Sequence, residues 1–136
     1  MIISKNLKID TKDNFQIIDI TKEIDNLLNN LDISNGILNI FSKHSTTAIV
    51  INENESGLLD DFKKSIGNLI PEQDNYKHDL IDNNAAAHLK SFLLSSSETI
   101  PISNNKLDLG TWQSIFFIEL DGPRKNRNIK VTVIGE

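Results

Sequence analysis

Short runs of β-branched and aromatic residues recur along the chain, separated by clusters of polar turn residues, and predict a series of strands. These runs cover residues 2–9, 15–20, 37–43, 46–52, 98–102, 106–109, 112–120 and 128–134. The polar cluster at 10–14 predicts that the first two strands pair as a hairpin.

Three other segments have the spacing of an amphipathic helix. The first follows Thr21 as its expected N-cap and presents an apolar face made of Ile24, Leu27, Leu28 and Leu31. The second begins after Ser56 as its expected N-cap, and its predicted buried face consists of Leu58, Leu59, Phe62, Ile66 and Leu69. Residues 71–82 form a polar loop, and the third helix, residues 84–94, should bury Ala85, Leu89 and Phe92.

The strands and helices are mixed without a regular βαβ alternation, which favours an α+β fold over a doubly wound sheet. The chain has 136 residues and no linker or internal repeat, so we expect one compact domain spanning residues 1–136. The predicted architecture is a set of antiparallel sheets with about three helices.

Composition excludes several classes of function. The chain has no cysteine, which removes disulfides, iron–sulfur ligation and thiol nucleophiles. A net charge of −5 argues against binding to nucleic acid or to an anionic membrane. The sequence has no glycine-rich phosphate loop that would indicate a nucleotide cofactor, and nothing in it indicates haem. It shows no secretory signal and no apolar stretch long enough to span a membrane, so we expect a cytoplasmic location.

A first polar segment surrounds the strand at 46–52. His44 is followed by three hydroxyl residues, among them Thr46, and the strand leads into Asn52 and Glu53. An imidazole and a carboxylate can transfer protons near neutral pH, and the hydroxyl groups can bind a polar ligand. The alternative is that these are ordinary strand and turn residues with a solvated glutamate.

A second polar segment includes His78 and the start of the third helix. Asn84, His88 and Ser91 have helical spacing and form a polar stripe beside the apolar one. Such a stripe can form the wall of a pocket, or it can be a solvated helix face.

A third segment combines an aromatic residue with a basic turn. Trp112 and Gln113 open an apolar strand, and Trp112 on its own is expected in the core. Both arginines of the chain, Arg124 and Arg127, lie within one turn. This turn is either an anion clamp, because guanidinium groups match phosphate geometry, or a solubilising hairpin tip.

The three histidines could together bind one metal ion, as three imidazoles do in some catalytic zinc sites. Their long spacing, from His44 to His78 to His88, leaves open whether they converge.

Taken together, these segments resemble the YjbQ family, whose pattern they follow in order along nearly the whole chain. The resemblance rests on residues 44–48, 52–54, 76–79, 87–91, 109–113 and 127–136. It implies a compact α+β fold assembled as a homotrimer, with sites near the subunit boundaries. It also implies a weak thiamine-phosphate synthase activity, which joins an aminopyrimidine methyl diphosphate to a thiazole phosphate and releases diphosphate.

The resemblance also suggests roles for individual residues. The expected catalytic residues are Glu53, His44 and His78. The expected substrate-binding residues are Thr46, Asn52, Asn84, Trp112, Gln113 and Arg127. His44, His78 and His88 would hold a divalent metal ion, zinc or magnesium, and Arg124 and Lys90 would join Arg127 in stabilising diphosphate.

Two rival hypotheses compete with this synthase activity on phosphorylated metabolites. One is a metal-dependent hydrolase that uses the three histidines. The other is a trimeric protein that binds a small phosphorylated metabolite without catalysis.

Overall fold

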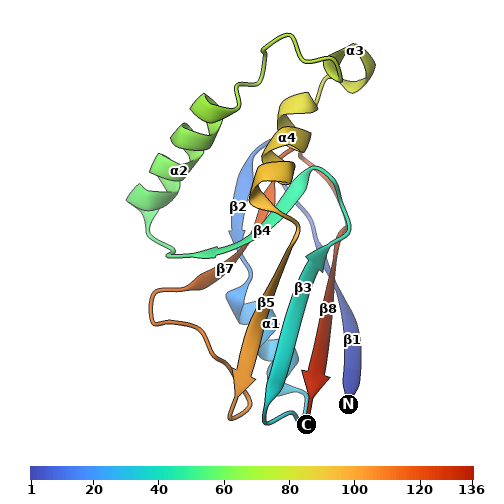
Figure 1. Cartoon of the computed structure of the whole chain (residues 1–136), viewed down its shortest axis with the longest axis vertical. Helices are drawn as coiled ribbons and strands as arrows, with labels where there is room; N and C mark the ends of the chain where they lie inside the picture. Colours follow the sequence, from blue (N-terminus) through green and yellow to red (C-terminus); the bar gives the residue numbers. More distant parts are fainter.

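The computed structural model describes residues 1–136, and the strands form two antiparallel sheets (Figure 1). The larger sheet has the order β1-β8-β3-β5-β6, and the smaller one has the order β2-β7-β4. The strands are β1 (Ile2–Ile9), β2 (Gln16–Asp19), β3 (Gly36–Ser42), β4 (Thr47–Asn52), β5 (Ser97–Ser103), β6 (Lys106–Leu107), β7 (Ser114–Glu119) and β8 (Arg127–Gly135). The helices are α1 (Thr21–Asn29), α2 (Ser56–Leu69), α3 (Asp79–Asp82) and α4 (Ala85–Leu94). The predicted α+β class is confirmed.

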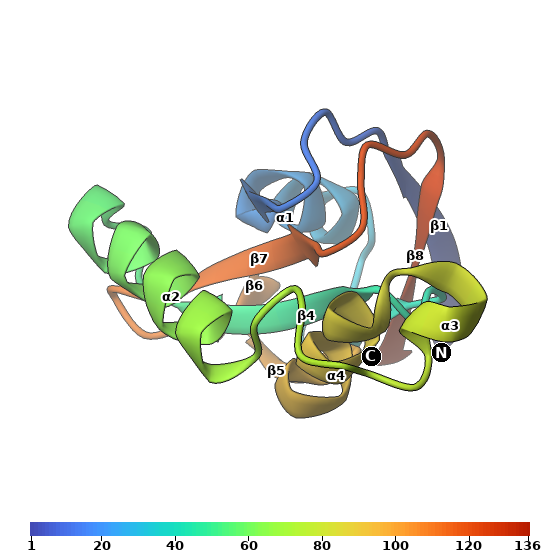
Figure 2. The same ribbon diagram turned by 90° about the horizontal axis from the view of Figure 1, so that it is seen from above.

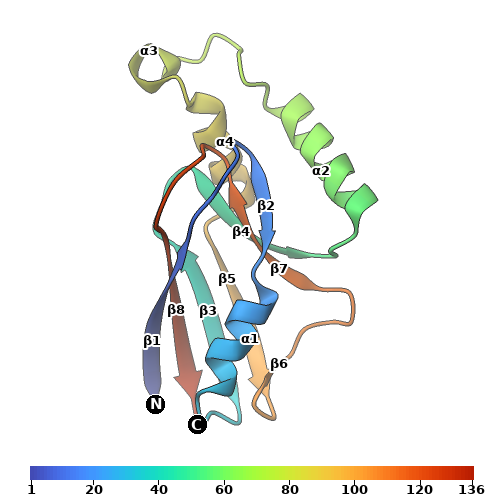
Figure 3. The same cartoon turned by 180° about the vertical axis from the view of Figure 1, so that it is seen from behind.

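The smaller sheet is buried on both faces. One face packs into the main core, where Ile49 and Phe117 join residues of α1 and of the larger sheet. Figure 3 shows α1 in front of β3 of the larger sheet. The other face places Ala48 and Phe116 against Ala87 of α4. Because alternate side chains enter two different cores, β7 is apolar almost without interruption instead of alternating with polar residues.

The predicted hairpin between the first two strands is wrong. β1 pairs with β8, with Ile2 opposite Ile134, whereas β2 pairs with β7 in the other sheet. The polar connection crosses between the sheets and is held by Thr11, whose N–H donates to the carbonyl of Arg124 at 2.8 Å. Each strand therefore finds a partner distant in sequence that the local turn pattern cannot reveal.

Gly122 makes this crossing possible. A Cβ atom at Gly122 would lie 2.2 Å from the carbonyl oxygen of Asp13, so only glycine allows the two connections to approach so closely.

Both predicted helix caps are displaced by one residue. Ile20, not Thr21, precedes α1 at the cap position, and Thr21 is the first residue of the helix. Glu55, not Ser56, caps α2, where its carboxylate accepts the N–H groups of Gly57 and Leu58. The glutamate side chain is longer than that of serine and reaches two free backbone N–H groups at once. It thereby satisfies donors that a helix start leaves unpaired.

The predicted buried helix faces are only partly correct. In α2 only Ile66 is buried, and α2 lies to one side of the smaller sheet (Figure 2). In α4 the buried residues are Ala85, Ala86, Ala87, Lys90 and Ser91. Phe92 is 86% exposed and Trp112 is 73% exposed, so neither belongs to the core of the chain. The loop expected at 71–82 contains the short helix α3, and no helix is long and apolar enough to cross a membrane.

Candidate functional site

A first group of polar residues lies where β3 passes into β4. Nε2 of His44 accepts the backbone N–H of Asn128 at 2.7 Å. Burial, and then the positive charge of Arg127, lowers the pKa of His44 below its ordinary value of 6.5. The ring is therefore neutral at pH 7, and because Nε2 acts as acceptor, the proton resides on Nδ1. His44 can thus donate a hydrogen bond to a ligand, whereas protonation at Nε2 would break its bond to Asn128.

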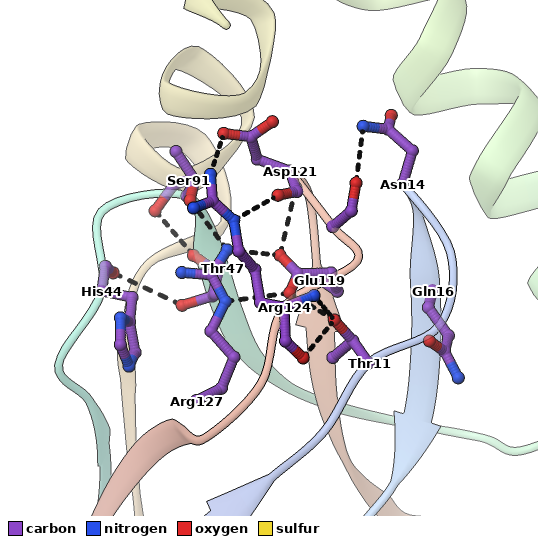
Figure 4. Close-up of polar contacts among 12 residues, drawn as sticks. Thr11, Asn14, Gln16, His44, Thr47, Ser91, Glu119, Asp121, Arg124 and Arg127 are labelled. Atoms are coloured by element: carbon purple, nitrogen blue, oxygen red, sulfur yellow. Dashed lines mark hydrogen bonds and ion pairs between the residues drawn. The ribbon is translucent and has the colours of Figure 1, made fainter.

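Arg127 and Glu119 form a buried ion pair beside His44 (Figure 4). Nε of Arg127 donates to Oε1 of Glu119 at 2.9 Å, and Nη2 donates to Oε2 at 2.5 Å. The same Nη2 donates to the hydroxyl of Thr46 at 3.0 Å. Arg127, expected to bind substrate, therefore binds Glu119 and Thr46 in the free chain, and Thr46, also expected to bind substrate, is engaged by Arg127.

Glu119 remains charged in this buried position. Burial opposes its charge, but hydrogen bonds from Arg127, from the hydroxyl of Thr11 and from the N–H of Asp121 outweigh it and hold the pKa of Glu119 below 4.5. The Thr11 bond measures 2.8 Å and the Asp121 bond 3.1 Å.

A second group of residues links the segment before α3 to the start of α4. The rings of His78 and His88 meet edge to face, with 4.8 Å between their centroids. Nε2 of His78 lies 3.0 Å from Oδ1 of Asn84, and Nδ2 of Asn84 donates to Asp121 at 2.9 Å. Both ends of the Asn84 amide, expected to bind substrate, are thus engaged within the chain.

The cations expected to bind diphosphate are already paired with carboxylates. Arg124 donates to Asp121 at 3.0 Å, and Arg127 pairs with Glu119. The buried ammonium group of Lys90 lies 2.9 Å from Glu72. Lys43, beside His44, and Lys77, beside His78, take part in no ion pair and are exposed, so both are free to meet an anion.

His88 contributes to two neighbouring open pockets. The first, with a volume of about 590 Å³, is lined by Lys43, His44, Ser45, His88, Ser91, Ser95 and Ser96, among others. The second, of about 420 Å³, is lined by His78, His88, Tyr76, Lys77 and Phe92, among others. His88 thus shares one pocket with His44 and the other with His78.

The chain alone does not assemble a three-ligand metal site. No group of three or more histidine, aspartate or glutamate side chains lies close enough to hold an ion. The expected metal ligation by His44, His78 and His88 stays a prediction, and the Asn128 bond at Nε2 of His44 weighs against it.

Glu53 lies at the opposite end of β4 from His44. The strand runs from Thr47 to Asn52, which at its usual rise separates the two ends by about 17 Å. Asn52 pairs with Ser114, which brings the neighbouring Gln113 and Trp112 to the Glu53 end. The structure therefore divides the expected site into a histidine half and a Glu53 half.

The Glu53 half contains an apolar cavity that sequence reasoning missed. It has a volume of about 280 Å³ and lies between the smaller sheet and α2. Of its 11 lining residues 9 are hydrophobic, and Asn52 and Glu53 supply its polar part. The only signal for it is the spacing of Val50 with Phe116 and Ile118, which β4 and β7 turn to the same face.

The comparisons with known proteins agree over the whole chain. Residues 5–136 match the family model described as "UPF0047 protein YjbQ-like". The chain belongs to the YjbQ-like family. A UPF0047 protein of Methanothermobacter thermautotrophicus is 50% identical over 135 residues, covering 99% of this chain and 94% of the relative. The UPF0047 protein YugU of Bacillus subtilis is 38% identical, covering 96% of this chain and 98% of YugU.

A YjbQ-like fold is also confirmed by solved structures. The crystal structure of a YbjQ-like protein of unknown function from Sulfolobus solfataricus has a TM-score of 0.97 at 40% identity. The match covers 100% of this chain and 99% of that one. The names of these YjbQ-like relatives state no reaction.

Two partner residues in this YjbQ-like chain escaped sequence reasoning. Glu119 and Asp121 hold Arg127 and Asn84, respectively. A signal for Glu119 was present, because it is the only charged residue in the apolar run from Ile115 to Leu120. A buried charge requires a partner of opposite sign.

Proposed function

We propose that this YjbQ-like protein is a cytoplasmic enzyme of the thiamine-phosphate synthase type. It would join an aminopyrimidine methyl diphosphate to a thiazole phosphate and release diphosphate. The observation that carries the proposal is the lining of the histidine pocket, where only 2 of 10 residues are hydrophobic. Lys43, His44 and the serine hydroxyls there are groups that bind phosphate oxygens.

In the proposed reaction, negative charge develops on the leaving diphosphate. The thiazole ring nitrogen forms a bond to the methylene carbon of the pyrimidine, and the carbon–oxygen bond to diphosphate breaks with its electron pair. Lys43 supplies positive charge for the departing anion, and the Nδ1–H of His44 donates a hydrogen bond to it. Fixed donors of this kind stabilise charge as it develops.

The Glu53 half supports binding of an uncharged ring. The apolar cavity accepts a small planar group, and the carboxylate of Glu53 and the amide of Asn52 can accept and donate hydrogen bonds at its edge. An aminopyrimidine combines such a ring with an amino donor.

We further propose that the two halves meet between copies of the chain in a homotrimer. A separation of about 17 Å along β4 is too long for one small substrate to span. Both halves are bordered by exposed apolar side chains, Phe92 by the histidines and Trp112 by Glu53, and Leu80 and Ile81 are exposed as well. Large exposed apolar residues near functional groups are typical of surfaces that a partner covers.

One chain supplies too few ligands for the expected zinc or magnesium ion. The donor set within one chain does not fit an ion, since at most the pair His78 and His88 comes together. No step of the proposed reaction is therefore assigned to a metal.

Incubation of the purified chain with both substrates, followed by measurement of thiamine phosphate and diphosphate, tests the proposal. Glu53→Ala and His44→Ala should each lower kcat at least about 100-fold, because each removes a fixed hydrogen-bonding group that the proposed reaction places on a substrate. Glu23→Ala, an exposed glutamate in α1, is the matched control and should leave the rate unchanged.

Other outcomes favour the rival functions. Thermal stabilisation by the phosphorylated substrates without product would favour a binding protein. Hydrolysis of a phosphate ester, in protein that carries metal when purified without chelator, would favour the hydrolase. Either result would overturn the proposed synthase.

A further inference from the structure

The strongest unexplained feature is a row of side chains that runs from a histidine to an exposed arginine. It consists of His78, Asn84, Asp121 and Arg124. The contacts within it measure 3.0 Å, 2.9 Å and 3.0 Å in that order. Asp121 has no part in the expected site, and Arg124, expected to stabilise diphosphate, instead ends this row through its bond to Asp121.

The donors and acceptors in the row fix the orientation of the Asn84 amide. Arg124 can only donate and an ionised Asp121 can only accept, and both Arg124 and Asn84 contact Oδ2 of Asp121. The amide group facing Asp121 must therefore be the NH₂ group, which turns the carbonyl oxygen of Asn84 toward His78. An amide oxygen cannot donate, so Nε2 of His78 must carry the proton.

We infer that Asp121 and Asn84 are positioning residues that hold His78 as its Nε2–H tautomer, with the lone pair of Nδ1 left free to accept a hydrogen bond from a ligand in the histidine half. The edge-to-face contact with His88 also restricts the His78 ring. Arg124 in turn holds Asp121 through two contacts, one from Nη2 to the carboxylate and one from Nε to the backbone carbonyl at 2.9 Å.

His44 has the opposite arrangement. Its Nε2 accepts a backbone N–H, so its proton lies on Nδ1 and it acts as a donor. The two histidines would thus divide the work, with Nδ1 of His78 accepting a hydrogen bond from a ligand and Nδ1 of His44 donating one. This division of roles rests on the proposed function, whereas the two tautomers can be measured without any substrate.

Long-range proton–nitrogen NMR of the full chain with ¹⁵N-labelled histidine tests the inference at about pH 8, where an ordinary imidazole is neutral. We expect a protonated Nε2 and an unprotonated Nδ1 for His78, and the reverse for His44. A protonated Nδ1 on His78, or averaged shifts of both tautomers, would overturn the inference. The wild-type spectrum decides this even if a variant fails to fold.

Asp121→Ala then tests the positioning role. Without Asp121 the Asn84 amide is free to turn over, so the His78 shifts should move toward the average of both tautomers while those of His44 stay unchanged. Asp82→Ala is the matched control, because Asp82 is exposed and its carboxylate makes no hydrogen bond. Unchanged His78 shifts in a folded Asp121→Ala protein would remove Asp121 from this role.

Kinetics separate the inference from the proposed function. With an active wild-type enzyme, Asp121→Ala should lower kcat roughly 10-fold to 100-fold with little change in KM, as loss of an orienting partner usually does. Expected tautomers in a protein without synthase activity would uphold the arrangement and overturn only the reaction.

Discussion

At the scale of single residues, the buried pair of Glu119 and Arg127 organises the surroundings of His44. It joins the end of β7 to the start of β8, and through Thr46 and Thr11 it reaches two further connections. The charge of Arg127 also contributes to the low pKa of His44. Loss of one partner from a buried pair is costly, because the other charge is left without compensation.

Glu119→Gln should therefore destabilise the protein by about 3 kcal/mol at neutral pH. Chemical denaturation measures this loss, with the exposed Glu23→Gln as a control that should stay within about 0.5 kcal/mol of wild type. A loss equal to that of the control would contradict a stabilising role for the pair.

The same variant has a pH signature. The pKa of Glu119 is lowered by folding, so its stabilisation is complete above the ordinary value of 4.5 and is lost as the pH falls through the folded value. Glu119→Gln lacks this contribution, so its deficit relative to wild type should shrink below pH 4.5. A constant deficit across that range would show that Glu119 does not act through its charge.

At the scale of elements, periodicity predicts where strands and helices lie but not which partners they choose. The run at 2–9 coincides with β1, and the helix expected to begin after Ser56 coincides with α2. The false hairpin shows the limit, because pairing of β1 with β8 depends on residues more than a hundred positions away. Local turn chemistry carries no information about that contact.

The buried face of α4 shows a second limit. The pattern of large residues favours burial of Phe92, whereas the helix packs through small ones. Ala87 meets Ala48 and Phe116, which lets α4 lie close to β4. Alanine supplies little hydrophobicity to a pattern, so a close helix–sheet contact of this kind is hard to recognise from sequence.

Ala87→Leu should accordingly destabilise the protein by about 1–3 kcal/mol, because added atoms overpack a closely fitted contact. Ser65→Leu places the same side chain at an exposed position of α2 and should change stability by less than about 0.5 kcal/mol. Thermal or chemical denaturation compares the two. Equal stability of both variants would contradict the close packing of α4 on the smaller sheet.

At the scale of the whole molecule, the residues expected at one site occupy two ends of a strand. The strand predicted at 46–52 already separates His44 from Glu53, and the structure places the two residues at opposite ends of β4. The partners Glu119 and Asp121 were missed because their importance comes from three-dimensional contacts. A complete site for the proposed reaction therefore requires neighbouring copies that join a Glu53 half to a histidine half.

Mixing two inactive variants tests this claim most directly. Glu53→Ala damages the Glu53 half and His44→Ala the histidine half. A composite site that takes its Glu53 half from a His44→Ala copy and its histidine half from a Glu53→Ala copy would therefore be intact. Co-refolding the two variants and measuring diphosphate release should then restore activity that neither variant shows alone. If the wild type is active and mass measurement confirms mixed assemblies, but the mixture stays as inactive as its parents, the composite site is contradicted.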